Sequence, residues 1–114
     1  MLKTNNDKTD MKIALITSCL AGVAHSKMAA VALTKEAEKR GHIIAVEEQG
    51  GHKIPTKLTS EQISEADVVI IAKMVTISGK NRFAGKPILD VSVNKAVREP
   101  ALIIDQAENL LTSS

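Results

Sequence analysis

The chain has 114 residues, of which 44% are apolar and 25% charged, and its formal net charge is +2. This length allows one domain with a modest core. The net charge is far smaller than that of a typical nucleic-acid-binding domain, which carries a dense basic patch. Phe83 is the one aromatic residue, so the core must be aliphatic, and the stacked rings that hold single-stranded nucleic acid are missing. We therefore expect no nucleic-acid partner.

The first half of the chain predicts a lead-in, a strand, a helix and a second strand. Residues 1–10 are polar and without period, so we expect a flexible lead-in, followed by a domain over 11–114. Residues 12–17 (KIALIT) and 42–46 (HIIAV) are apolar runs typical of strands buried in a parallel sheet. Between them, 24–40 predicts a helix that ends at Gly41. We interpret Glu47 to Gly51 as a turn out of the second strand.

The second half predicts a short helix, two more strands and a final helix. Thr59 and Gln62 match a capping box that opens a helix ending near Ala66. Residues 67–72 and 88–91 predict strands, with a helical turn at 81–83 between them. A last helix should start near 99–100, because proline is tolerated in the first turn. Its expected buried residues are Ile103, Ile104, Ala107, Leu110 and Leu111.

Strands alternate with helices and no hairpin signal occurs, which predicts an α/β fold. We expect an open three-layer sandwich of about four parallel strands with helices on both faces. Strand order cannot be read from the pattern; we place the first strand in the middle as a working hypothesis. Ligands of such sheets bind beyond the carboxyl ends of the strands, so residues 18–26, 47–51 and 73–82 should lie along one edge.

The most informative segment is a cysteine loop between the first strand and the first helix. It comprises Ser18, Cys19, Leu20, Ala21, Gly22, Val23, Ala24, His25 and Ser26. Backbone N–H groups ahead of a helix N-terminus form a nest that binds an anion and lowers the pKa of a thiol. We expect Cys19 to be a nucleophile that carries a phosphoryl group in this nest. The alternative is that Cys19 is a buried apolar filler.

Neighbouring side chains refine this prediction. Ser18, His25 and Ser26 could donate hydrogen bonds to the bound phosphate. A cysteine phosphatase needs an arginine where His25 stands, and also an acid for the leaving group. Their absence favours a carrier that holds a phosphoryl group and passes it on.

Other kinds of site are not indicated. A lone cysteine cannot form an intrachain disulfide, which favours a reducing compartment. No apolar run reaches membrane-spanning length and no signal peptide is visible, so we expect a cytoplasmic protein. The three histidines show no metal-ligand spacing, and we expect no metal and no cofactor beyond the covalent phosphoryl group. Glu47 and Glu48 are interpreted as residues of a solvated loop.

Several segments in order resemble the fructose-type IIB component of the bacterial phosphoenolpyruvate-dependent sugar phosphotransferase system (PTS), over about residues 11 to 111. They are Thr17-Ser18-Cys19-Leu20-Ala21-Gly22-Val23-Ala24-His25-Ser26, Met28-Ala29-Ala30, Glu47-Glu48-Gln49-Gly50, Leu58-Thr59, Ile63, Ala66-Asp67-Val68-Val69-Ile70 and Arg82-Phe83-Ala84-Gly85-Lys86-Pro87.

The resemblance implies a phosphotransferase subunit. Cys19 would accept phosphate from a phosphohistidine of a IIA protein and pass it to a sugar held by the membrane IIC component. The chain would then associate peripherally with IIC. We also expect Gln49, Gly50 and Arg82 to lie along the same edge and to contact a partner.

The chain also departs from the family pattern. Leu20 and Ala21 replace the usual proline and threonine, and Glu48 replaces a threonine. These differences are compatible with a fructose-like relative that handles another sugar. Two other functions stay open at this point: an enzyme of the low-molecular-weight cysteine phosphatase or arsenate reductase type, and a non-catalytic regulatory domain.

Overall fold

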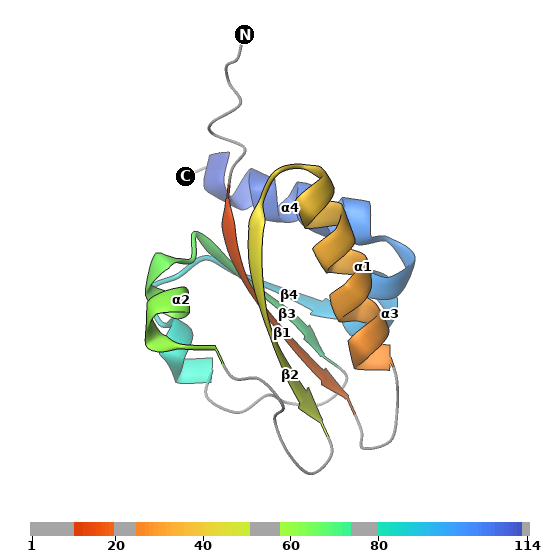
Figure 1. Ribbon diagram of the computed structural model, residues 1–114, viewed down its shortest axis with the longest axis horizontal. Helices are drawn as coiled ribbons and strands as arrows, with labels where there is room; N and C mark the ends of the chain where they lie inside the picture. Colours follow the sequence, from red (N-terminus) through yellow and green to blue (C-terminus); the bar gives the residue numbers. More distant parts are fainter. Residues whose placement is uncertain (1–10, 20–24, 51–57, 74–79, 113–114) are drawn as a thin grey trace, which may run out of the picture.

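A computed structural model describes residues 11–19, 25–50, 58–73 and 80–112 (Figure 1). The predicted lead-in, 1–10, lies outside the described residues. The elements in chain order are β1 Lys12–Cys19, α1 His25–Lys39, β2 Ile43–Gly50, α2 Ser60–Glu65, β3 Val68–Lys73, the 3-10 turn η2 Lys80–Phe83, β4 Ile88–Ser92, α3 Val93–Arg98 and α4 Pro100–Thr112.

The four strands form one parallel sheet with the order β2-β1-β3-β4. The predicted parallel α/β fold and the middle position of the first strand are confirmed. Cys19 pairs in register with Gly50, and Lys73 pairs with both Ser18 and Ser92. All four strands therefore end along one side of the sheet, which we call the carboxyl edge.

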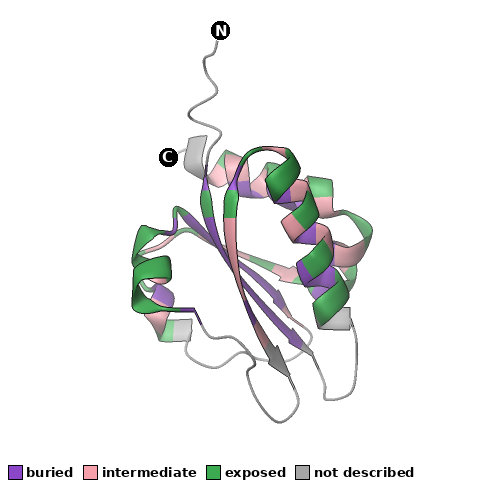
Figure 2. Cartoon of the chain, in the orientation of Figure 1, coloured by how far each residue is buried: buried purple, intermediate pink, exposed green. Residues whose placement is uncertain are grey.

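Helices cover both faces of the sheet, as predicted, but the two layers are unequal. Helices α1, α3 and α4 pack on one face, while α2 and η2 lie on the other (Figure 1). Buried residues concentrate on β1 and β3 (Figure 2), because these two central strands are covered on both faces.

Alternating strand residues divide the core into two clusters. Ile13, Leu15, Val68 and Ile70 belong to the larger one, beneath α1, α3 and α4. The smaller cluster consists of Ala14, Ile16, Leu58, Ala66, Val69, Ile71 and Phe83. Phe83 is fully buried there and joins η2 to the sheet.

Local signals account for several boundaries. Gly41 follows α1 with φ +87°, the left-handed geometry that ends a helix. The predicted capping box is present, since the Thr59 side chain accepts from the backbone of Gln62 and the Gln62 side chain accepts from the backbone of Thr59. The final helix starts at Pro100, with Ile103, Ile104 and Ala107 fully buried and Leu110 partly buried. The side chain of Leu111 lies outside the described part.

One local prediction was wrong, and one helix was not predicted. Residues 47–50 continue β2 instead of forming a turn, because β1 runs on to Cys19 and supplies their pairing partners. Helix α3 was not predicted: it starts directly after β4, where the Ser92 hydroxyl accepts from the backbone of Lys95 and caps it. None of the described helices is long and apolar enough to cross a membrane.

Candidate functional site at the carboxyl edge

Cys19 is the last residue of β1, one of the two central strands, and α1 begins six residues later at His25. The backbone therefore places Cys19 on the carboxyl edge, where a parallel sheet binds its ligands. Ser18 beside it is buried. The intervening residues, Leu20, Ala21, Gly22, Val23 and Ala24, lie outside the described residues, as do the side chains of Cys19, His25, Ser26 and Gln49. The phosphate-binding roles of the loop residues and the partner contact expected at Gln49 stay predictions.

An ion pair lies on the neighbouring strands at this edge. Lys73 ends β3 in register with Ser18, and its Nζ is 3.2 Å from Oδ1 of Asp90 on β4. Both side chains are more than a third exposed, so the pair contributes little to stability. Lys73 was predicted to lie on this edge. Its position beside Ser18 follows from the strand order, which the sequence does not give.

Glu47 corrects the prediction of a solvated loop. Its side chain is fully buried on the face covered by α2 and η2. Arg82 donates to both carboxylate oxygens, from Nη1 to Oε1 at 2.9 Å and from Nη2 to Oε2 at 3.0 Å. The backbone N–H of Leu58 donates to Oε1 at 2.9 Å. These bonds replace the water that a carboxylate loses on burial.

Arg82 reaches Glu47 from η2 and is itself only 21% exposed. Its guanidinium carbon lies 4.9 Å from the centroid of the Phe83 ring, within range of a cation–π interaction. Arg82 is thus fixed from two sides. Its role as a partner contact at the edge stays a prediction.

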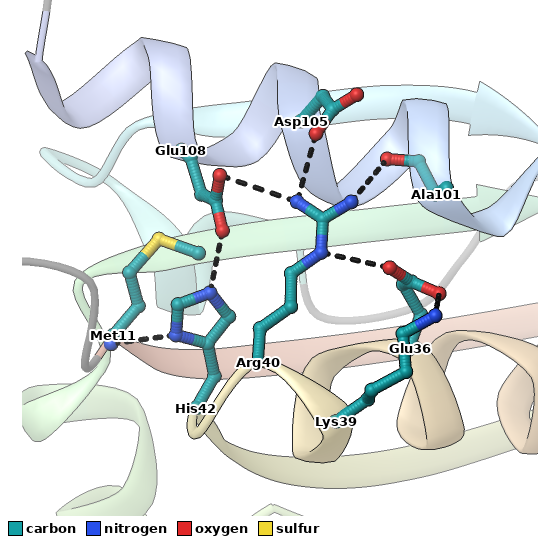
Figure 3. A network of polar contacts seen from close by, with 8 residues as sticks. All are labelled: Met11, Glu36, Lys39, Arg40, His42, Ala101, Asp105 and Glu108. Carbon is teal, nitrogen blue, oxygen red and sulfur yellow. Dashed lines mark hydrogen bonds and ion pairs between the residues drawn. The ribbon is translucent and has the colours of Figure 1, made fainter.

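A second polar network lies at the opposite edge of the sheet (Figure 3). His42, just before β2, is buried; its Nδ1 accepts from the backbone of Met11 at 3.1 Å, and its Nε2 is 2.8 Å from Oε2 of Glu108. The Met11 bond requires a free lone pair on Nδ1, so Nε2 carries the proton and donates to Glu108. This network ties the start of the sheet to α4.

Arg40 completes this network by bridging α1 to α4. It contacts Glu36 at 2.8 Å, Asp105 at 2.8 Å and Glu108 at 3.2 Å. Burial alone would lower the pKa of Arg40, but its hydrogen bonds to Asp105, Glu36 and Glu108 raise it above the ordinary value. The hydrogen bond from Arg40 in turn holds the pKa of Glu36 below its ordinary value. Within the described residues, no group of three or more His, Cys, Asp or Glu side chains could hold a metal ion.

Comparison with known proteins identifies the family. The family model "PTS system, Lactose/Cellobiose specific IIB subunit" matches residues 14–106. The PTS system fructose-like EIIB component 2 of Escherichia coli K12 is 40% identical over 97 residues, covering 85% of this chain and 92% of that protein. The PTS system fructose-specific EIIB component of Haloferax volcanii is also 40% identical, over 88% of this chain and 63% of its own length.

A solved structure agrees with these matches. A domain of the fructose-specific IIABC component of Borrelia burgdorferi superposes with a TM-score of 0.82 at 41% identity, over 88% of this chain and 95% of that domain. The parallel α/β fold and these matches thus define a domain of the sugar phosphotransferase system. The chain belongs to the PTS IIB family, among its fructose-type components, and the resemblance seen in the sequence is confirmed.

Proposed function

We propose that Cys19 is the phosphoryl carrier of this IIB component. The observation that carries the proposal is the place of Cys19 at the end of a central parallel strand, just ahead of a 15-residue helix. A helix N-terminus carries about half a positive charge and points free N–H groups outward. Such a setting favours both a thiolate and a phosphate ester of it.

The chemistry consists of two displacements at phosphorus. The Cys19 thiolate attacks the phosphoryl group of a phosphohistidine on a IIA protein; an S–P bond forms, the N–P bond breaks, and the imidazole keeps the electron pair. A sugar hydroxyl then attacks the phosphocysteine, so that an O–P bond forms, the S–P bond breaks and the thiolate returns. The hydroxyl proton passes to a base. No redox step or cofactor is needed.

Fused relatives support a membrane partner. The fructose-like PTS system EIIBC component of Escherichia coli K12 is 40% identical over 93 residues, which are 19% of that longer protein. The fructose-specific EIIB'BC component of Rhodobacter capsulatus is 41% identical over 106 residues, 18% of its length. Both names join B and C components in one chain. We infer that this chain acts at the cytoplasmic surface beside a IIC permease and receives its phosphate from a IIA protein.

The sugar belongs to the fructose group or is related to it. Relatives of similar identity carry different sugar names: the EIIABC component of Escherichia coli K12 named for 2-O-alpha-mannosyl-D-glycerate is 40% identical over 101 residues. IIB identity alone therefore does not select the sugar. Uptake of labelled sugars by vesicles containing the cognate IIC protein identifies it.

The experiment is a transfer assay on the whole chain. Phosphoenolpyruvate, the general transfer proteins and the cognate IIA protein are mixed with the wild type or the Cys19→Ser variant. We expect one acquired phosphoryl group on the wild type and none on the variant, by intact-protein mass spectrometry. A label that persists in Cys19→Ser would sink the proposal. Turnover of p-nitrophenyl phosphate would favour a phosphatase instead, and very slow alkylation of Cys19 by iodoacetamide would favour a regulatory domain.

A further inference from the structure

One buried ion pair joins three segments that are distant in the sequence. We call Glu47, Arg82 and the backbone N–H of Leu58 the clamp. Three hydrogen bonds of 2.9 to 3.0 Å hold it together. Glu47 belongs to β2, Leu58 precedes α2, and Arg82 lies in η2. A single carboxylate thus links β2 to the start of α2 and to η2.

The clamp lies close to the end of the strand that carries Cys19. Glu47 pairs with Ile16, three residues before the pair of Gly50 with Cys19, which is about 10 Å at the rise of a parallel strand. Gly50 ends β2 at the carboxyl edge, so the clamp holds the strand that pairs with Cys19.

Stability alone does not explain a charged pair at this position. Replacing a buried ion pair by apolar residues of similar volume is often neutral or stabilising. The larger core cluster, beneath α1, α3 and α4, lies on the other face and does not include the clamp residues. A bidentate arginine–carboxylate pair does fix the relative orientation of its two side chains, because two parallel hydrogen bonds hold the guanidinium and the carboxylate in one plane.

We propose that Glu47 and Arg82 are positioning residues for phosphoryl exchange at Cys19. This inference rests on the proposed function of Cys19. The clamp holds β2 three residues before Gly50, the register partner of Cys19, and it thereby orients the strand ends at which donor and acceptor meet the cysteine. Its loss slows transfer while the larger core keeps the chain folded.

The test compares the wild type with Arg82→Lys and with the double variant Glu47→Met, Arg82→Met. Transfer is measured from a IIA protein carrying radioactive phosphohistidine, at several IIA concentrations, so that kcat and KM separate. Since a misplacement of about 1 Å can cost about 100-fold in rate, we expect kcat of the double variant to fall at least about 10-fold, with a smaller change in KM. Arg82→Lys keeps the charge but loses the bidentate geometry, so its kcat should lie between those of the wild type and the double variant.

A matched control is Glu108→Ala, which removes a partly buried ion pair at the opposite edge. It should lower thermal stability without changing kcat. If the double variant unfolds, the Arg82→Lys variant provides the test. A near-native melting temperature together with a reduced kcat in Arg82→Lys supports the positioning role of Glu47 and Arg82. A folded clamp variant whose kcat stays within about twofold of wild type overturns this inference alone. A wild-type chain that accepts no phosphate on Cys19 overturns the proposed function as well.

Discussion

The buried imidazole of His42 makes Glu108 the most consequential polar residue at the edge opposite Cys19. In Glu108→Ala, the Nε2–H of His42 loses its acceptor at 2.8 Å, and Arg40 loses a carboxylate at 3.2 Å. The His42 side chain is 0% exposed, whereas Glu108 is 30% exposed. The principal effect is therefore a buried donor left without its partner.

The magnitude follows from these contacts. An unsatisfied buried donor costs about 1–3 kcal/mol. The lost Arg40 contact adds about 0.5 kcal/mol or less, because the pair is partly exposed and Arg40 keeps Glu36 and Asp105. We expect the free energy of unfolding to fall by about 2 kcal/mol, which lowers the melting temperature by about 8 °C for a domain of this size.

The assay is urea and thermal unfolding followed by far-ultraviolet circular dichroism, since the chain has no Trp or Tyr. Glu108→Gln is the conservative control, because its amide oxygen can still accept from His42; it should lose less than about 1 kcal/mol. Asp105→Ala removes a partner of Arg40 that is 54% exposed, and should cost about 0.5 kcal/mol or less. The reasoning is refuted if Glu108→Ala is no more destabilising than Asp105→Ala.

Three further predictions concern single side chains. Thr17 is fully buried and its hydroxyl has no hydrogen-bond partner in the structure as described, so Thr17→Val should raise the free energy of unfolding by about 1 kcal/mol in urea titrations. Thr59→Ala removes the N-cap of α2 and should cost about 1 kcal/mol by the same measurement. Glu36 has a lowered pKa through Arg40, so it stabilises the fold above its ordinary pKa of 4.5, and this contribution disappears as pH falls through the lower folded value. Glu36→Gln should flatten the acid limb of stability against pH.

Each of these predictions has an outcome that contradicts it. A destabilised Thr17→Val would mean that the hydroxyl is satisfied in solution. For the cap, Ser60→Ala is the control at the exposed neighbouring position; equal losses in the two variants would remove the special role of Thr59. An acid limb that is the same in Glu36→Gln and wild type would show that Arg40 does not stabilise the Glu36 carboxylate.

Local chemistry in the sequence was enough to predict most elements and the candidate nucleophile. The consecutive apolar residues from Ile13 to Ile16 identified β1, because a strand covered on both faces buries neighbouring residues on both sides. Gly41 and the Thr59–Gln62 box marked helix ends through interactions within a few residues. The position of Cys19 between strand and helix followed from the same local order. These features need no knowledge of the distant chain.

The tertiary structure alone decided the arrangements that depend on distant partners. Glu47 and Glu48 were predicted to lie in a solvated turn, because no residue close to them in the sequence neutralises a carboxylate. Burial of Glu47 depends on Arg82, which is 35 residues away. His42 likewise depends on Glu108, 66 residues away. The strand order and the unequal layers also come from pairing across the sheet. A charged side chain is buried only where the fold places an opposite charge or hydrogen-bond partner beside it. Those partners are distant in the sequence, so a local pattern does not predict them.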